Sequence, residues 1–387
     1  MKDTKANNTP IPKRYVTSSL HKAVARATDS RCYGTAFAFR EETANLVWSL
    51  NKAMGSDLWL ITLKQRLGLP DHILDKLPDE GDIIGRAFSY EKEHPSLFAG
   101  DEIGQAAVYY SYETRDHTMF GNQTNGYYAD YQSTLTRLFS EGKNPVTVDE
   151  IPSDPKKFPL LIVPSAARMK REEIDALMKY TDGGGTVVVT GPSPLPGCEH
   201  HWKLQNRADC APDAFFTYVF DGNHLNIPVW QSAPIECLDE NEFRLVSPGL
   251  YYDPCRCSDP SVMDGVLRLF DRFAPKLPVE ILSAEGYYTT TFRSNDAITV
   301  HALAVDYDVE IDEELDAMRF HRSRVNLITK IRPKGLNGTI RLRADRAPKV
   351  YLPFSDKAAI VKRDGEAFVI ELPKDCYYAI LSFSDLA

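Results

Sequence analysis

Residues 158–192 read FPLLIVPSAARMKREEIDALMKYTDGGGTVVVTGP, and this stretch decides the fold class. Two apolar runs, LLIV at 160–163 and VVV at 187–189, enclose a segment of helical spacing that ends at three consecutive glycines. Short continuous apolar runs are typical of strands that are covered on both faces of a sheet. A strand, a helix and a strand in this order predict a βαβ unit, whose two strands run in parallel.

The flanking residues extend the same alternation. Upstream, strands are predicted at residues 106–110 (AAVYY) and 145–148, with an amphipathic helix between them that carries Tyr131, Leu135 and Phe139 on one face. Downstream, residues 195–260 show no readable pattern, and a last helix is predicted after Ser261. Residues 104–275 are therefore predicted to form an α/β domain with a doubly wound, flavodoxin- or amidotransferase-like parallel sheet.

Residues 1–103 contain a second, shorter β/α unit. A strand at 33–39 (YGTAFAF), a helix at 42–54 and a strand at 58–63 (LWLITL) follow one another, and Gly55 is placed to end the helix. The second strand is apolar throughout, so we expect both of its faces to be covered and Trp59 to lie in the core. Its open edges also need a cover, which the α/β domain, a second copy of the chain or another chain could supply.

The C-terminal residues 276–387 change to an apolar period of two. Strands are predicted at 287–293, 297–305, 325–331, 339–343, 358–362, 367–371 and 377–383. Asp364 and Gly365 stand between two of these runs and form a strong hairpin signal. This number of short strands, separated by turn residues, predicts a β-sandwich.

Composition excludes several classes of partner. The 387 residues carry a formal net charge of −9, which argues against nucleic acid or an anionic membrane as the main partner. That charge is compatible with a neutral sugar ligand. No apolar signal segment is visible at the start and no run is long enough to span a bilayer. Seven scattered cysteines, an odd number, favour reduced thiols in the cytoplasm over a disulfide framework.

Three segments together resemble the C-terminal part of glycoside hydrolase family 42, the β-galactosidase-like enzymes. The stretch 106–192, with AAVYYSYET, YYADYQSTLTRLFSEG and the segment quoted first, resembles that family's glutamine-amidotransferase-like trimerisation domain. AMGSDLWLITL resembles the last strand of its (β/α)₈ barrel, and ITVHALAV with VNLITKIRP resembles its small C-terminal β domain. The resemblance implies a partial, TIM-barrel-like β/α segment at residues 1–103, which can supply about the last two barrel strands.

The same resemblance implies a carbohydrate-active protein. Its general acid/base would follow the fourth barrel strand, a part that these residues do not supply, so we expect an incomplete or split enzyme without independent catalysis. If active, it would be a glycoside hydrolase acting on β-galactoside-like or related glycosides. The alternative is a non-catalytic structural or oligomerisation module. The expected partners are a sugar and either further copies of the chain, as a trimer, or an upstream barrel chain.

Candidate site residues follow the two barrel-like strands. Glu41 and Glu42 stand where a retaining glycosidase keeps its nucleophile, if residues 33–39 are the seventh strand. Arg40 on the same side, with Lys64 and Arg66 after the next strand, could bind substrate. The competing interpretation of Glu41 and Glu42 is an acidic first helical turn, which the helix dipole favours.

Neither a cofactor nor a metal site is expected. Cys198, Glu199, His200 and His201 are metal-ligand types, but adjacent ligands are spaced too closely for all of them to converge on zinc. The alternating acids between Asp306 and Asp312 lack the glycine and glutamate that an EF-hand needs, which favours a solvated acidic loop. The α/β domain shows no cysteine at a strand-to-helix elbow, so we expect no glutaminase activity.

Overall fold

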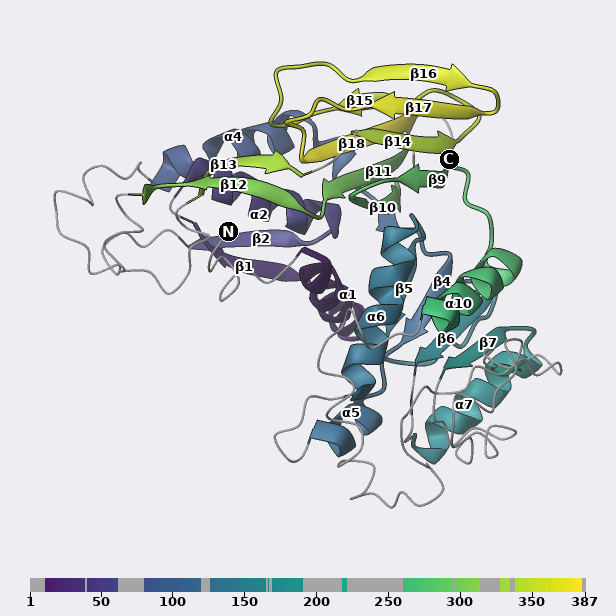
Figure 1. Cartoon of the computed structure of the whole chain (residues 1–387). Helices are drawn as coiled ribbons and strands as arrows, with labels where there is room; N and C mark the ends of the chain where they lie inside the picture. The colour runs from purple at the N-terminus through teal and green to yellow at the C-terminus, as the bar shows by residue number, and fades with distance from the viewer. Residues whose placement is uncertain are drawn as a thin grey trace.

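The computed structural model describes residues 11–38, 40–61, 80–119, 126–164, 166, 169–190, 218–220, 260–295, 297–313, 328–334 and 338–384. Within these residues, parallel and antiparallel sheets combine with helices into a mixed α/β architecture (Figure 1). None of the described helices has the length and apolar character required to cross a membrane.

A five-stranded sheet forms the centre of the predicted α/β domain. Its strands, in the order β5-β4-β6-β7-β8, are β5 (Pro145–Val148), β4 (Ala106–Tyr109), β6 (Leu160–Pro164), β7 (Thr186–Thr190) and β8 (Tyr218–Phe220). The first four pair in parallel, and β8 pairs antiparallel to β7. The parallel pairing predicted through residues 160–163 is therefore confirmed, with β7 inside the sheet.

Helices cover both faces of this sheet, as alternate buried side chains on each strand require. On one face, Val108 and Ile162 share a core cluster with Leu135 of α6 (Gly126–Ser140). On the other, Leu161 packs in a separate cluster with Leu177 of α7 (Arg171–Asp182). Two more of the described helices in this part of the chain are α5 (Tyr112–Met119) and α10 (Pro260–Phe273).

The glycine turn between α7 and β7 permits a close approach. A Cβ atom on Gly185 would lie 2.2 Å from the ring of Tyr180, which is a distance that real Cβ atoms do not show. Tyr180 is buried, and its hydroxyl donates a hydrogen bond to the carbonyl of Phe158 just before β6. The glycine therefore lets the end of α7 pack directly on the sheet.

The N-terminal residues form the predicted second β/α unit. The elements are α1 (Ile11–Ala27), β1 (Tyr33–Phe37), α2 (Glu41–Ala53), β2 (Asp57–Ile61), α4 (Glu80–Glu93) and the 3₁₀ turn η2 (Pro95–Leu97). The two strands pair in parallel, and Gly55, with φ of 62°, follows the C-cap of α2. Gly34 lies against Asn51, so α2 packs directly on one face of this two-stranded sheet.

The expectation that both faces of β2 are covered is wrong for Trp59. Trp59 is 65% exposed and Tyr33 is 51% exposed. The register places Thr35 opposite Trp59, so these side chains share one face. That face is opposite to the one on which α2 packs at Gly34, and this is why the indole lies in solvent.

The C-terminal residues form antiparallel sheets. One has the order β15-β18-β11-β10-β3 and another the order β16-β17-β14-β9, while β12 and β13 form a separate pair. Their bounds are β3 (Asp101–Glu102), β9 (Glu280–Ala284), β10 (Tyr287–Arg293), β11 (Ala297–Ala304), β12 (Tyr307–Ile311), β13 (Ile328–Pro333), β14 (Thr339–Arg343), β15 (Lys349–Tyr351), β16 (Ile360–Asp364), β17 (Ala367–Glu371) and β18 (Tyr378–Ser384).

Two details of this region bear on the sequence predictions. The hairpin predicted at Asp364–Gly365 is confirmed, because Asp364 pairs with Ala367 across a two-residue turn that begins at Gly365 with φ of 61°. The acidic loop predicted around residues 306–312 is wrong, because most of it is strand β12. Its acids alternate with half-buried Val309 and Ile311, as a strand with one open face requires.

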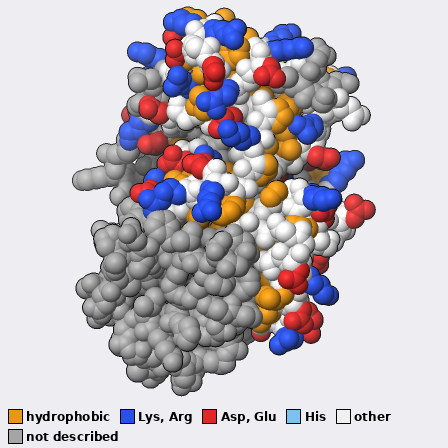
Figure 2. Space-filling model, turned by 90° about the vertical axis from the view of Figure 1, so that its right-hand side faces the viewer, with side chains coloured by type: hydrophobic (Ala, Val, Ile, Leu, Met, Phe, Trp, Pro, Cys, Tyr) orange, Lys and Arg blue, Asp and Glu red, His pale blue; other side chains and the backbone are white. Residues whose placement is uncertain are grey.

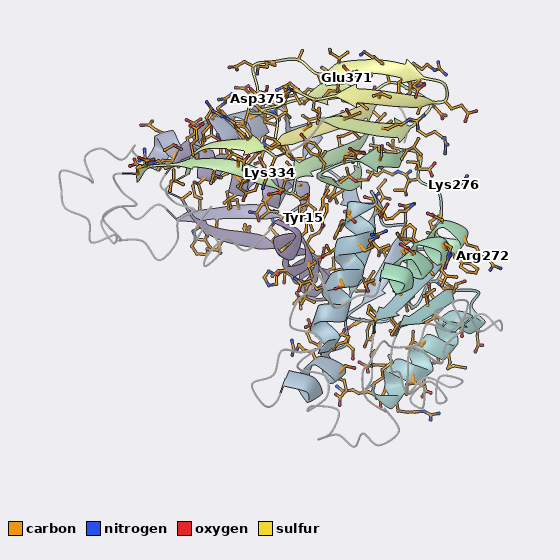
Figure 3. All side chains as sticks on the ribbon, in the orientation of Figure 1. Tyr15, Arg272, Lys276, Lys334, Glu371 and Asp375 are labelled. Atoms are coloured by element: carbon orange, nitrogen blue, oxygen red, sulfur yellow. The ribbon has the colours of Figure 1, made fainter. Side chains whose placement is uncertain are left out.

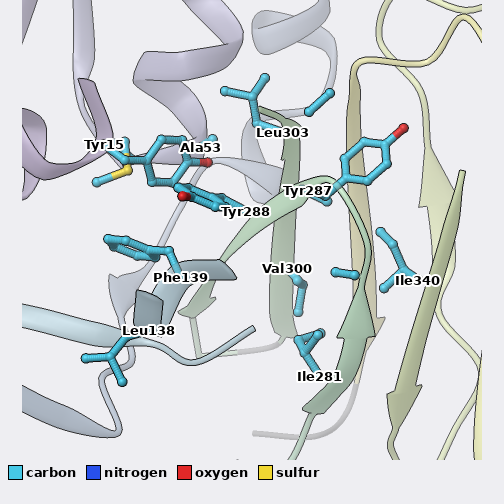
Figure 4. Packing of buried hydrophobic residues seen from close by; sticks show 14 of the residues in the cluster. Tyr15, Ala53, Leu138, Phe139, Ile281, Tyr287, Tyr288, Val300, Leu303 and Ile340 are labelled. Carbon is cyan, nitrogen blue, oxygen red and sulfur yellow. The ribbon is translucent and has the colours of Figure 1, made fainter. Parts of the chain in front are cut away.

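A shared core joins all three predicted ranges, and Tyr15, labelled in Figure 3, belongs to it. The ring of Tyr15 in α1 lies 5.3 Å from Phe139 in α6 and 5.2 Å from Tyr288 in β10, in edge-to-face geometry (Figure 4). Fully burying one such side chain contributes about 1.5–3 kcal/mol. Strand β3 of the N-terminal range also pairs with β10 of the C-terminal range. The division into domains at 1–103, 104–275 and 276–387 stays a prediction.

Candidate functional site

The two candidate carboxylates lie where β1 is followed by α2. Glu41 and Glu42 form the acidic first turn of this helix, immediately after the N-cap Arg40. The Glu41 side chain is exposed and the Glu42 side chain is half-buried. Consecutive helical side chains point about 100° apart, so these two do not face each other as a catalytic pair. A second carboxylate for a two-carboxylate mechanism would have to come from elsewhere.

Glu42 has an unusual electrostatic environment. Burial raises the pKa of its carboxyl, and the negative charge of Glu41 raises it further, while Arg86 on α4 and Lys330 on β13 act in the opposite direction. Burial also raises the pKa of Tyr377, and the charge of Glu42 adds to that rise. A carboxyl with a raised pKa suits proton donation better than nucleophilic attack. Of the two acids, Glu41 is the one open to solvent.

Arg40 is held by an ion pair. Its guanidinium contacts the carboxylate of Asp312, just after β12, and both side chains are about three-quarters shielded from solvent. The pair therefore joins the carboxyl end of β1 to the β12–β13 hairpin, across 272 positions of sequence. The sequence singled out both Arg40 and the acids around Asp312 but not their pairing, because a long-range ion pair leaves no local pattern.

The other predicted site residues lie outside the described residues. This applies to Lys64 and Arg66, the proposed substrate-binding residues after β2, and to the cluster of Cys198, His200 and His201. Among the residues that the structure describes, no group of three or more His, Cys, Asp or Glu side chains could hold a metal ion. The roles predicted for Arg40, Glu41, Glu42, Lys64 and Arg66 remain predictions.

The opposite end of the β1–β2 pair borders a cavity of about 970 Å³. Cys32, just before β1, and Asp57, the first residue of β2, both line it. Glu41 and Glu42 follow the other end of β1, so at least the length of a five-residue strand, about 16 Å, separates the two places. We call this space the basal cavity. No pattern in the sequence pointed to it, because its walls come from distant segments.

Comparisons with known proteins show a shared fold. No protein-family model matches the sequence, and no curated protein matches it either. Solved structures do match, and the three described below are glycosidases. The resemblance to family 42 β-galactosidases is confirmed at the level of the fold.

The matching structures cover nearly the whole chain at low identity. The α-L-fucosidase isoenzyme 2 of Paenibacillus thiaminolyticus has a TM-score of 0.54 at 12% identity, covering 97% of this chain and 63% of that one. The family 42 β-galactosidase Gan42B of G. stearothermophilus has a TM-score of 0.53 at 13% identity, over 97% and 56%. The β-galactosidase of Bacillus circulans sp. alkalophilus has a TM-score of 0.54 at 10% identity, over 97% and 58%.

The chain spans between 56% and 63% of the length of these three glycosidases. Identities of 10–13% show a shared fold and do not transfer an activity. The activity, substrate and partners of this chain are therefore matters of proposal.

Proposed function

We propose that this protein is a carbohydrate-active relative of family 42 glycoside hydrolases that supplies the last two β/α units of a barrel and needs strands from a separate chain for catalysis. The observation that carries this proposal is the half-open β1–β2 pair. Helix α2 packs on one face, whereas Trp59 and Tyr33 lie 65% and 51% exposed on the other. Parallel strands of this kind are normally buried on both faces.

The geometry of the pair supports a barrel over other arrangements. Two parallel strands joined by a helix that returns over one face are the repeating unit of a (β/α)₈ barrel, in which the second face points to the barrel interior. The five-residue register from Tyr33–Asp57 to Phe37–Ile61 has no slip. Isolated two-stranded sheets are marginal in water, so added strands would stabilise the pair.

The catalytic part of the proposal is centred on Glu41. Active sites of such barrels lie at the carboxyl ends of the strands, and Glu41 is the solvent-exposed carboxylate at that end of β1. Retaining hydrolysis needs a second carboxyl about 5–5.5 Å away, which the partner chain would contribute. Arg40, Lys64 and Arg66 are proposed to contact the sugar.

The rest of the fold supports an assembly role. The strand order β5-β4-β6-β7-β8 corresponds to 2-1-3-4-5 along the chain, the doubly wound order of flavodoxin-like proteins. We infer from it an amidotransferase-like trimerisation domain. The four-stranded and five-stranded antiparallel sheets share one core through Ile340 and Val300, which supports a β-sandwich. On the described part of the face in Figure 2, basic and acidic side chains are interspersed, unlike the continuous basic surface that binds nucleic acid.

Two measurements test the proposal. The purified chain should not hydrolyse aryl β-galactosides, and it should gain hydrolysis when co-expressed with a chain of β/α repeats encoded by a neighbouring upstream reading frame. Glu41→Gln should abolish the gained rate, whereas Glu113→Gln, on α5, should not. Robust hydrolysis by the chain alone that Glu41→Gln removes would falsify the claim that a partner is needed.

The second candidate function is a non-catalytic oligomerisation module. The observation in its favour is that every described strand except β1 and β2 belongs to the α/β sheet or to the antiparallel sheets, which hold none of the predicted catalytic residues. Under either function we expect light scattering to give a mass larger than the 43.6 kDa of one chain, with a trimer expected. A complementing partner that restores hydrolysis separates the first function from the second.

A further inference from the structure

The basal cavity lies where four parts of the fold meet. Its lining includes the last turns of α1, the end of α2, strand β3 with Phe98 just after η2, and the loop that follows β5. Several lining residues are buried, among them Lys22, Lys52, Phe292 and His301, and we refer to these four as its inner part. Exposed Ser153 and Asp154, in the loop after β5, lie at its rim.

Charged side chains of both signs line the inner part in pairs. The Lys22 ammonium lies 2.6 Å from Glu102, and the Lys52 ammonium lies 3.2 Å from Asp57 and 2.7 Å from Glu91, which is outside the lining. Arg26 lies 3.5 Å from Glu102 and also donates to the carbonyl of Thr147 on β5. A lysine ammonium has three donors, and the contact with Glu102 uses one donor of Lys22. The walls thus offer donors next to acceptors.

The balance of charge restricts the ligand. The cavity is lined by five basic side chains (Lys22, Arg26, Arg31, Lys52 and Lys157) and six acidic ones (Asp57, Asp101, Glu102, Asp149, Glu150 and Asp154), so 5 − 6 gives −1. Neither a polyanion nor a polycation is favoured by such a lining. A purely apolar molecule would desolvate these charges without compensation. A neutral molecule that carries several hydroxyl groups can donate to the carboxylates and accept from the ammonium and guanidinium groups.

Two aromatic rings add an apolar surface. The Lys22 ammonium lies 5.6 Å from the ring centroid of Phe292, and the Lys52 ammonium lies 6.0 Å from that of Phe98. Both rings line the cavity. A pyranose presents hydroxyls at its edge and C–H groups on its face, so it matches a site that combines ion pairs with ring surfaces. The volume of about 970 Å³ lies at the upper end of ligand-binding cavities and leaves room for more than one sugar unit.

We propose that the basal cavity is a second, non-catalytic binding site for a neutral mono- or oligosaccharide, distinct from the carboxyl end of β1. The choice of a sugar among polyhydroxylated molecules rests on the proposed function. Because the walls come from α1, β3, the β5 loop and β10, a bound sugar holds together segments that are far apart in the sequence. Binding therefore stabilises the fold as a whole, by the linkage between ligand occupancy and unfolding.

The test is direct binding to the purified full chain. Lactose and galactose are titrated at concentrations up to tens of millimolar and followed by saturation-transfer difference NMR and calorimetry, with sorbitol as an acyclic polyol. We expect saturable binding of at least one sugar, weaker binding of sorbitol, and a rise in Tm with sugar. Absence of saturable binding by either sugar overturns the proposal.

Variants place the binding in the cavity. Ser153→Trp puts a bulky side chain at the rim and should abolish binding, whereas Ser140→Trp, the same change at an exposed position outside the lining, should leave it unchanged. Glu102→Gln should weaken binding by at least about tenfold, as expected for one hydrogen bond to a charged group. Because Glu102 partners buried Lys22, its variant could unfold; the rim variants carry the test in that case. Equal binding by the Ser153→Trp and wild-type proteins would overturn the assignment.

The two proposals fail separately. If the chain binds sugar, Ser153→Trp abolishes this binding, and no partner confers hydrolysis, then the cavity proposal holds and the proposed catalysis is wrong. If a partner confers hydrolysis that Glu41→Gln abolishes, but the chain alone binds no sugar, then the proposed catalysis holds and the cavity proposal is wrong.

Discussion

The Nδ1 atom of His301 lies 2.7 Å from the hydroxyl oxygen of Tyr378, and its Nε2 atom lies 3.0 Å from the carbonyl oxygen of Leu97. A carbonyl oxygen can only accept, so Nε2 carries the hydrogen and Nδ1 accepts from the tyrosine. The ring is fully buried, and burial lowers the pKa of His301 to about 4. A neutral imidazole thus ties β11 to β18 and to η2, beneath the basal cavity.

This arrangement predicts a loss of stability in mild acid. An unfolded histidine has a pKa of 6.5, so between pH 6.5 and about 4 the unfolded state binds more protons than the folded one. The contribution of His301 is fully present above pH 6.5 and is lost as pH falls toward 4. A shift of this size corresponds to about 3 kcal/mol. Denaturant unfolding followed across this range measures it.

A matched variant separates the effect of His301 on stability from the effect of the carboxylates, which also titrate in acid. His301→Gln keeps a donor and an acceptor without a titrating group, so its free energy of unfolding should fall less between pH 6.5 and 4 than that of the wild type. Parallel pH profiles for the two proteins would contradict the assignment of a neutral, buried ring.

Glu42 predicts a pH dependence of opposite sign. Its folded pKa is raised, chiefly by burial, so the folded state holds the proton more tightly than the unfolded state. Its ionisation therefore destabilises the fold as pH rises above the ordinary carboxyl value of 4.5 and through the raised folded pKa. Glu42→Gln should raise Tm at neutral pH and have little effect at pH 4. Differential scanning fluorimetry at both values checks this, and a lower Tm at neutral pH would count against it.

Tyr15 predicts cooperative unfolding across the predicted domain boundaries. Truncating a buried aromatic side chain costs about 3–5 kcal/mol. Because Tyr15 packs on both Phe139 and Tyr288, Tyr15→Ala should lower the midpoint of a single unfolding transition seen by all probes. Tyr33→Ala, the same change at an exposed position, should alter stability by less than about 0.5 kcal/mol. A separate early transition confined to the N-terminal residues would show that residues 1–103 unfold on their own.

Local patterns in the sequence predicted the elements well and their contacts poorly. The apolar runs at 160–163 and 187–189 predicted β6 and β7, because continuous apolar strands need parallel neighbours on both sides. The period of two predicted β10, β14 and β17 with their observed bounds. Strand β15 has three residues and β3 has two, too few for a period to register.

The surroundings of the candidate site were harder to predict from the sequence, for a physical reason. Glu41 and Glu42 were found because they follow a recognisable strand. Lys330 and Tyr377, which act on Glu42, and Asp312, which pairs with Arg40, come from the far end of the chain. The basal cavity is likewise walled by segments from all three predicted ranges. Trp59 was predicted to be buried and is exposed. An apolar run predicts burial whether or not a partner for the second face of the strand is present.

The exposed indole of Trp59 is the sharpest test of the proposed barrel completion. In the isolated chain, acrylamide should quench its fluorescence, and the quenched component should decrease in Trp59→Phe. In a complex with the complementing chain, this component should become protected, because the open face of β1–β2 would then point into a packed interior. Trp59→Asp should leave Tm within a few degrees of wild type, since the side chain is 65% exposed, but should abolish complementation. Phe88→Asp, on the 43% exposed Phe88 of α4, is the matched control and should complement normally. Normal complementation by Trp59→Asp would show that this face does not contact the partner, and the barrel would have to be completed elsewhere or not at all.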